Sequence, residues 1–338
     1  MELLWSRSFL NTISFLGLKE DKALVGTTFG FSVLDANTGR RIISKATWKR
    51  VQSLDFWEDK YVVGQSFPGS IMWFEEKDPL WIYRTTGSVN AVLHFGSHII
   101  AGTGFLTDIK GARHVYVSPY YVDDKWREMK GKLRGVLYSI SRDLNIRWRK
   151  EVQGIVGDLI RISQDLVLVR MVYNKIGTIR SSNGEWISLR EFEEPIRAAT
   201  TSDNEVFLIT RNNLVKASLP DLEVLGQIRT YKPFALATSP RYVCLTEGKN
   251  VLKCYEKDSL KLVWKKMLTQ NIRGLKFVTD DGLIAITAKE RHGKILLISP
   301  KGEILEERKI SRVPIYISGY GSKFLVGTLS KVFAFECS

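Results

Sequence analysis

The sequence predicts an all-β fold, an eight-bladed β-propeller of four-stranded antiparallel blades, and three observations lead to it. A unit of roughly 39 residues, with four short apolar strands separated by polar turns, recurs along nearly the whole chain. Glycine and Asp/Asn-rich turns punctuate the units, and no stretch keeps a helical periodicity. A strand left over at the start of the chain matches a strand missing at its end, so the two ends are expected to complete one blade and close the ring.

The repeat is clearest in residues 51–87 and 233–270. The last unit supplies only three strands, and residues 2–9 supply its fourth. Seven blades is the alternative, if the weak unit at 155–194 is miscounted. The innermost strands are expected to begin near Ile13, Val51, Val89, Ile155, Ile196, Phe234, Ile272 and Pro314.

The chain is predicted to form a single propeller domain over residues 1–338, interrupted once by an insertion at 106–134. The insertion falls between the second and third strands of the third blade and is rich in aromatic and basic residues. Long loops in compact domains are usually functional or disordered. We therefore expect the insertion to act as a lid or arm.

The composition favours an acidic partner. The 338 residues carry a net charge of +14, and 44% of them are hydrophobic. A basic protein attracts nucleic acid, anionic lipid or acidic protein, although a lysine-rich solvated surface gives the same balance. The first residues lack the apolar core of a signal peptide, and no apolar run is long enough to span a membrane, so a cytoplasmic location is expected. Abundant charged residues and scarce glutamine favour a thermophilic source.

Three cysteines argue against a secreted disulfide scaffold. Cys244 and Cys254 flank a Gly-Lys-Asn turn symmetrically, so they are expected to face each other across a hairpin. They could form a disulfide or pack as two small buried apolar residues. We expect the second arrangement.

One turn resembles a known repeat. Residues 33–42, VLDANTGRRI, resemble the pyrroloquinoline-quinone-type propeller repeat, in which a tryptophan follows the turn. Ile43 stands where this unit's own tryptophan is expected. The resemblance implies that an indole on the outer strand docks between adjacent blades. Tryptophan occupies the matching position in other units, at Trp5, Trp81, Trp148 and Trp264.

The quinone-dependent dehydrogenases with this repeat hold their cofactor and Ca²⁺ at the centre of the ring, beside a vicinal disulfide. This chain has no adjacent cysteine pair and no evident central set of Glu, Asn and Asp. It therefore resembles the non-enzymatic branch of these quinoprotein-like propellers. More distantly, it resembles the tryptophan-aspartate-repeat propellers that scaffold assemblies.

The sequence contains no recognisable set of catalytic residues. We therefore predict a protein that is not an enzyme, with no catalytic residue, no cofactor and no metal site. His94 and His98 are spaced like ligands on a helix, but here they lie on a strand–turn–strand and are expected to pack or face solvent. No Cys-x-x-Cys, phosphate-binding loop or His-Glu-x-x-His occurs. The alternative is an enzyme or small-ligand binder with its site at the central channel.

Loop charge is predicted to divide between the two faces of the ring. The loops into each first strand and those between second and third strands, the top loops, sum to about +13, and the opposite turns to about −10. Aromatic residues lie among these cations, a mixture suited to a phosphate backbone with exposed bases or to an acidic protein surface. The candidate partner-binding residues are Lys45, Trp48, Lys49, Arg50, Arg84, Tyr120, Tyr121, Trp126, Arg197, Arg229, Tyr231, Lys232, Arg273, Arg291 and Arg312.

The sequence thus predicts a non-catalytic binding scaffold whose basic top face engages a polyanionic partner in an assembly. Nucleic acid or a ribonucleoprotein is slightly preferred, and an acidic protein is nearly as well supported. The acidic bottom face could take a second, basic partner.

Overall fold

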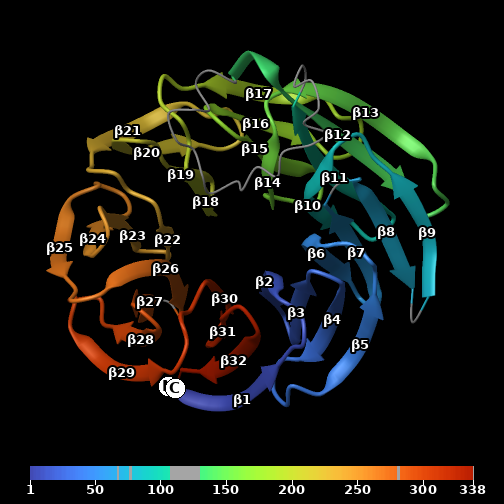
Figure 1. Ribbon diagram of the computed structural model, residues 1–338. Coiled ribbons are helices and arrows are strands. Elements are labelled where there is room, and N and C mark those ends of the chain that lie inside the picture. Colours follow the sequence, from blue (N-terminus) through green and yellow to red (C-terminus); the bar gives the residue numbers. More distant parts are fainter. Residues whose placement is uncertain (67, 76–77, 107–129, 280–281, 338) are drawn as a thin grey trace. The chain divides into compact units, whose positions relative to one another are not determined.

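In the part of the chain that the structure describes, the strands form eight separate antiparallel sheets of four strands each (Figure 1). The computed structural model describes residues 1–66, 68–75, 78–106, 130–279 and 282–337. Within these residues the one helical segment is a 3₁₀ turn, Lys130–Lys132. The fold is therefore an all-β, eight-bladed propeller, as predicted, and the seven-bladed alternative is wrong. We number the blades 1–8 by their first strands.

The chain divides into two compact units, and each is described by itself. Unit 1 comprises residues 1–46, 198–216 and 225–338, and unit 2 comprises residues 47–197 and 217–224. Unit 2 holds blades 2–4, and unit 1 holds blades 1, 6, 7 and 8 and most of blade 5. That the chain is one domain over residues 1–338 stays a prediction.

Unit 2 contains three complete sheets. Blade 2 is β6 (Val51–Trp57), β7 (Lys60–Gln65), β8 (Ser70–Glu75) and β9 (Asp78–Arg84). Blade 3 is β10 (Ser88–His94), β11 (His98–Leu106), β12 (Leu133–Ser141) and β13 (Ile146–Gln153). Blade 4 is β14 (Val156–Arg161), β15 (Leu166–Met171), β16 (Lys175–Arg180) and β17 (Trp186–Glu191).

Blades 1, 5 and 6 follow the same order. Blade 1 is β2 (Ile13–Lys19), β3 (Lys22–Thr27), β4 (Gly30–Asp35) and β5 (Arg41–Ala46). Blade 5 is β18 (Ala198–Ser202), β19 (Glu205–Ile209), β20 (Asn213–Ser218) and β21 (Val224–Arg229). Blade 6 is β22 (Leu236–Thr238), β23 (Tyr242–Glu247), β24 (Val251–Glu256) and β25 (Leu262–Met267).

Blade 8 is completed by the start of the chain, as the sequence predicts. Blade 7 is β26 (Asn271–Val278), β27 (Gly282–Lys289), β28 (His292–Ile298) and β29 (Ile304–Ile310). Blade 8 is β30 (Tyr316–Tyr320), β31 (Lys323–Gly327), β32 (Lys331–Glu336) and β1 (Glu2–Ser8). β1 pairs antiparallel with β32, from Glu2 opposite Glu336 to Ser8 opposite Lys331. The pairing covers an edge that β32 would otherwise expose.

The insertion lies where it is predicted, between β11 and β12 of blade 3, and its residues 107–129 lie outside the described residues. Three innermost strands, β18, β22 and β30, begin two residues later than expected from Ile196, Phe234 and Pro314. The other five begin within one residue of the expected position.

The position of a strand within its blade decides how its side chains are buried. Second strands such as β3 and β7 are buried at nearly every residue, because both faces of the sheet are covered there. Fourth strands such as β9 and β25 instead alternate between exposed and covered residues, as edge strands do.

Tryptophan joins adjacent blades, as the resemblance implies. Each of the four predicted indoles sits on a fourth strand and donates its Nε1–H to a backbone carbonyl in a turn of the next blade. The bonds run from Trp5 to Ala36 O (2.8 Å) and from Trp264 to Pro300 O (2.8 Å) in unit 1, and from Trp81 to Arg142 O (2.8 Å) and from Trp148 to Ser181 O (2.9 Å) in unit 2. Ile43, at the equivalent position of blade 1, is buried without this bond.

Three of the four turns that receive these indoles have a glycine in the left-handed conformation, whereas the turn that receives Trp81 has Leu144 there, with a φ of +66°. Gly39, Gly184 and Gly302 have φ angles of +67°, +72° and +81°. A Cβ at these positions would lie 2.7, 2.6 and 2.8 Å from the indoles of Trp5, Trp148 and Trp264, closer than real Cβ contacts come. At these three positions glycine therefore avoids both the strain of the backbone conformation and a clash with the ring.

The structure overturns the expectation that the two facing cysteines stay reduced. Cys244 and Cys254 face each other across β23 and β24, as predicted, and are joined by a disulfide. Cys337 is a free, buried cysteine, and its burial raises the pKa of the thiol. The sequence spacing of Cys244 and Cys254 therefore predicts that they face each other, but it does not predict whether they are oxidised.

Candidate binding surface

The top edge of a blade is the end at which its first strand begins and its second strand turns into its third. Backbone hydrogen bonds tie these connections together in each unit. In blade 2, Ser66 N–H donates to Arg50 O at 2.9 Å, and Thr85 N–H donates to Gly69 O at 3.0 Å. In blade 1, Thr28 N–H donates to Thr12 O at 3.0 Å. Loops that are separate in sequence therefore form one surface at the edge of each blade.

In unit 2 the loop before β6 presents a tryptophan to solvent. Trp48 is 87% exposed and has a φ of +58°, a conformation that a bulky residue rarely adopts. Buried Gln65 holds the loop from below, because its Nε2 donates to Thr47 O at 3.2 Å and its Oε1 accepts from Ser70 Oγ at 2.5 Å. Thr47 Oγ1 also donates to Lys49 O at 3.0 Å. The exposed indole therefore stands on a fixed support.

Basic residues lie close to Trp48 in the sequence and at the same top edge. Lys49 Nζ donates to Pro68 O at 2.8 Å, and partial burial, helped by the charge of Arg84, lowers the pKa of Lys49. Arg84 is exposed at the end of β9, and Arg50 is half-buried. An anion placed between Lys49 and Arg84 would relieve the repulsion between them.

Arg197 lies just before β18, in a segment held by a buried arginine that the sequence does not reveal. Arg170 is 1% exposed, its Nε is 2.5 Å from Asp158 Oδ2, and its Nη1 donates to Ile196 O at 3.3 Å. Gly157 makes room for it, since a Cβ there would lie 2.9 Å from Arg170 Nη2. Arg197 itself is half-buried.

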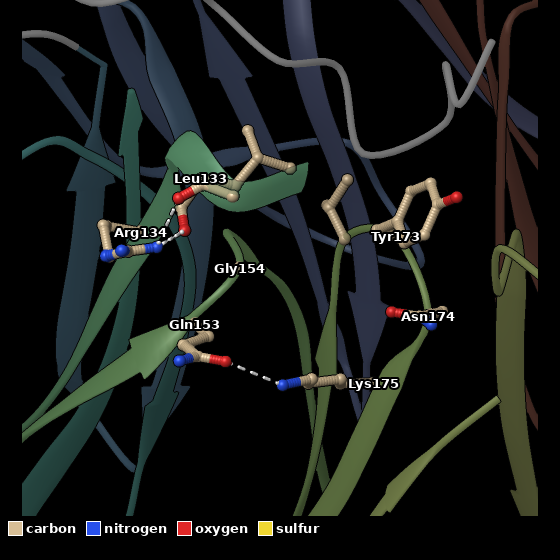
Figure 2. Close-up of a pocket in the computed structure, with 9 residues that line it drawn as sticks. Leu133, Arg134, Gln153, Gly154, Tyr173, Asn174 and Lys175 are labelled. Carbon is tan, nitrogen blue, oxygen red and sulfur yellow. Dashed lines mark hydrogen bonds between the residues drawn. The ribbon is translucent and has the colours of Figure 1, made fainter. Parts of the chain in front are cut away.

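A small pocket of about 250 Å³ lies at the top edge of blades 3 and 4, at the described base of the insertion (Figure 2). Lys175 Nζ is 3.0 Å from Gln153 Oε1, the bond drawn in Figure 2, and 3.4 Å from Glu191 Oε2. Arg134 Nη1 donates to Gly131 O and Leu133 O, each at 3.0 Å. The lining residues are Gly131, Leu133, Arg134, Gln153, Gly154, Val172, Tyr173, Asn174 and Lys175.

Tyr173 places an unusual backbone conformation in the wall of this pocket. Its φ is +100°, and its carbonyl accepts the Ile196 N–H at 2.6 Å. Strained residues of this kind persist only where the surrounding structure fixes them. Arg134 and the Lys175 that pairs with Glu191 lie at its rim, and the volume of the pocket is below the range of about 300–1,000 Å³ usual for drug-sized ligands.

In unit 1 the loop before β22 repeats the design of the Trp48 loop. Tyr231 is 61% exposed, and Lys232 has a φ of +45° with its Nζ 5.3 Å from the centre of the Tyr231 ring. Glu247 supports the loop, because its Oε1 accepts the Tyr231 N–H at 3.1 Å. Lys253 neutralises that carboxylate through an Nζ–Oε1 contact of 2.7 Å. Each loop thus displays an exposed ring beside a lysine. The side chain that holds the loop adds no net negative charge, because Gln65 is neutral and Glu247 is paired with Lys253.

The other predicted residues of unit 1 also lie at top edges or next to them. Lys45 is half-buried in β5, Arg229 ends β21, and Arg273 is exposed near the start of β26. Arg291 is exposed between β27 and β28, and Arg312 is exposed between β29 and β30, where its Nη1 bonds to Ser330 Oγ. Tyr120, Tyr121 and Trp126 lie outside the described residues. That the residues of the two units form one continuous face stays a prediction.

Sequence reasoning overlooked three exposed apolar residues at the top edges of unit 1. Leu10 is 105% exposed, Phe29 56% and Leu329 59%. Each stands in a short connection between strands, where polar residues are the rule. A large apolar residue at a turn position, within SFLNT, TTFG or TLSK, is the signal that could have revealed them.

His94 and His98 pack in the interior of unit 2, as predicted. His94 is fully buried with its ring 4.4 Å from that of Trp73, and His98 stacks on Phe95 at 5.1 Å. Burial, with a smaller contribution from nearby Arg147, lowers the pKa of His98 from 6.5 to about 4. The guanidinium of Arg161 covers the Phe95 ring at 4.3 Å.

Within the described part of the chain, no group of three or more His, Cys, Asp or Glu side chains could hold a metal ion. The same residues include no helix that is long and apolar enough to cross a membrane.

Comparison with known proteins supports the fold alone. No protein-family model and no curated protein matches the sequence. Solved structures do match over the whole chain. The computationally designed protein Ika8 is 12% identical with a TM-score of 0.76, and all of both chains is covered. BamB from Moraxella catarrhalis is 10% identical with a TM-score of 0.75, covering 100% of this chain and 98% of its own.

The C-terminal WD40 domain of Sif2 is 10% identical with a TM-score of 0.72, covering 100% of this chain and 98% of its own. Identities this low establish the propeller architecture and carry no activity over. The fold implied by the sequence resemblance is thus confirmed, and descent from the quinone-type repeat stays a prediction.

Proposed function

We propose that this protein is a non-catalytic binding platform whose basic top loops engage a polyanionic partner. One observation carries the proposal: two loops, one in each unit, have the same design. Each presents an exposed ring, Trp48 or Tyr231, beside a lysine, and a hydrogen bond with Gln65 or Glu247 holds each loop in place. Loops fixed before binding lose little conformational freedom when a partner docks.

Nucleic acid is the partner that this combination favours. Lysine and arginine neutralise phosphates, and exposed rings stack on bases that are not paired. An acidic protein is the second candidate, because tryptophan, tyrosine and arginine are also the usual anchors of protein interfaces. The exposed Leu10, Phe29 and Leu329 favour this second candidate. A basic partner for the opposite edges of the blades stays part of the proposal.

A small-ligand binder is the alternative from another class, and the pocket beside Tyr173 is its site. The similar solved structures support the platform architecture and say nothing of the partner. Binding of a small anion alone, without any macromolecule, would favour this alternative.

Charge reversal tests the proposal. A variant with Lys49, Arg50, Arg229 and Lys232 replaced by Glu is expected to elute from heparin at much lower salt than the wild type and to lose RNA binding. The matched control replaces Arg40, Lys261, Lys265 and Lys301, which are exposed away from the top edges. The control residues are also replaced by Glu, so the net charge changes by the same amount in both variants. If the control keeps its binding, the loss in the top-loop variant comes from the local site and not from overall charge.

The salt dependence of binding gives a second readout. If phosphates are contacted, the logarithm of the affinity falls linearly with the logarithm of the salt concentration, and the slope becomes shallower in the top-loop variant. Equal retention of wild type and top-loop variant would count against the proposal. Equal loss in both variants would show that total charge, and not these loops, attracts the polyanion.

A further inference from the structure

We infer that the top edge of blades 8 and 1 docks an acidic, amphipathic segment of a partner protein through Leu10, Phe29 and Leu329. We call these three residues the apolar tips. This goes beyond polyanion binding by the basic loops, because none of the three apolar side chains can neutralise a phosphate and the two leucines have no ring to stack on a base. All three tips belong to unit 1.

Backbone hydrogen bonds join the three loops that carry the tips. In the loop between β1 and β2, Phe9 N–H donates to Ser330 O at 2.8 Å and Ile13 N–H donates to Leu329 O at 2.7 Å. The turn between β3 and β4 is tied to the same loop, since Thr28 N–H donates to Thr12 O at 3.0 Å. The tips therefore belong to one surface and are not scattered exposed residues.

The turns under Phe29 and Leu329 are built alike. Thr27 is buried, and its Oγ1 donates to Gly30 O at 3.0 Å and accepts the Phe29 N–H at 3.4 Å. Thr328 is 1% exposed, and its Oγ1 donates to Lys331 O at 3.2 Å and accepts the Ser330 N–H at 3.4 Å. A buried threonine thus sets each turn, so the apolar side chains are held in the solvent before any partner arrives.

The charges near the tips decide the chemistry of the occupant. Residues 8–13, 27–31, 310–316 and 327–332 contain no Asp or Glu. Arg312 is bonded to Ser330 beside Leu329, and Lys331 follows directly. Apolar anchors with a basic rim complement a segment that alternates apolar and acidic side chains. Three anchors match the few side chains that an amphipathic helix inserts into its receptor.

A displayed library of random 16-residue peptides, selected on the whole purified protein, tests this inference. Enriched peptides are expected to combine Leu, Ile, Phe or Trp with Asp and Glu. A fluorescent copy of the most enriched peptide should bind at least tenfold more weakly, by anisotropy, to a variant with Leu10, Phe29 and Leu329 replaced by Ser. The matched control replaces Leu225, Ile304 and Leu305, which are also exposed, on outer strands of the same unit, and should bind like the wild type.

The remaining outcomes separate this inference from the proposed function. Enrichment of acidic peptides without apolar residues, or equal binding by both triple variants, would overturn the inference and leave the polyanion site standing. Absence of any enriched peptide would also overturn it. Vesicles of phosphatidylserine and phosphatidylcholine form a separate arm, and tip-dependent binding to these vesicles without peptide binding would assign the tips to a membrane surface instead.

Discussion

His98 is a buried titratable side chain that lies outside the proposed binding surface. Its folded pKa of about 4 is below the unfolded value of about 6.5, so the unfolded chain takes up a proton first as the pH falls. The contribution of neutral His98 to stability is therefore complete above pH 6.5 and is lost as the pH drops toward 4. Between pH 7 and pH 5 we expect a loss of about 2 kcal/mol in the free energy of unfolding from this residue.

Denaturant unfolding at pH 7 and pH 5 measures this loss. The variant His98→Phe keeps a ring to stack on Phe95 but cannot titrate, so its stability should change less with pH than that of the wild type. His292→Gln is the control, because His292 is exposed at the start of β28. Identical pH profiles for the wild type and His98→Phe would show that His98 does not titrate as described.

Individual residues were predictable where their role repeats along the chain. The four docking tryptophans were found because they recur at one position of the unit. Arg170 was missed, because its carboxylate partner lies across a strand pair and no local pattern marks it. The apolar tips were missed because a search for charge passes over lone hydrophobic residues in turns.

The turn that receives each indole is the element that links neighbouring blades, and Gly302 tests it. Replacing Gly302 with Ala adds a Cβ 2.8 Å from the Trp264 ring at a φ of +81°. We expect this variant to lose about 2–3 kcal/mol in the free energy of unfolding, in part from backbone strain and in part from the clash.

Gly321→Ala separates the two contributions. Gly321 has a similar φ of +59°, but a Cβ there would meet nothing within 4 Å. This control should lose about 1 kcal/mol from backbone strain alone. Chemical denaturation of both variants gives the difference, and equal losses would contradict a close fit between Gly302 and Trp264.

Strand order and number were predictable because short apolar strands and polar turns alternate regularly. The first strands of blades 5, 6 and 8 begin later than predicted. Residues 196–197, 234–235 and 314–315 are apolar or basic, which favours a strand, yet they precede β18, β22 and β30. The disulfide was not predictable, because facing cysteines have the same spacing whether oxidised or reduced.

At the scale of the whole molecule, the pairing of β1 with β32 joins the two ends of the chain. Deleting residues 1–9 would uncover the backbone of β32 and remove Trp5 with its bond to Ala36. We expect a lower melting temperature and concentration-dependent aggregation, because an uncovered strand edge pairs with other chains.

Thermal scans and light scattering over a range of protein concentrations measure both effects. Leu3→Ser is the control, since Leu3 is 44% exposed and its backbone pairing is kept. A truncated chain that stays monomeric and melts with the wild type would show that blade 8 does not need its fourth strand.

The binding surfaces were predictable only in part. Loop charge follows from sequence once the topology is known, which is why Lys49, Arg84 and Lys232 were found. The supports beneath them, Gln65 and Glu247, come from neighbouring strands and become visible only in three dimensions.

The exposure of Trp48 makes it a built-in optical reporter. Among the tryptophans in the described residues Trp48 is the exposed one, while Trp5, Trp73 and Trp81 are buried, so within this set a soluble quencher such as iodide should act first on the emission of Trp48. A partner that covers this loop would shield that fraction from the quencher and shift its emission to shorter wavelengths. The protein therefore carries a label-free readout of occupancy at the very loop where docking is proposed.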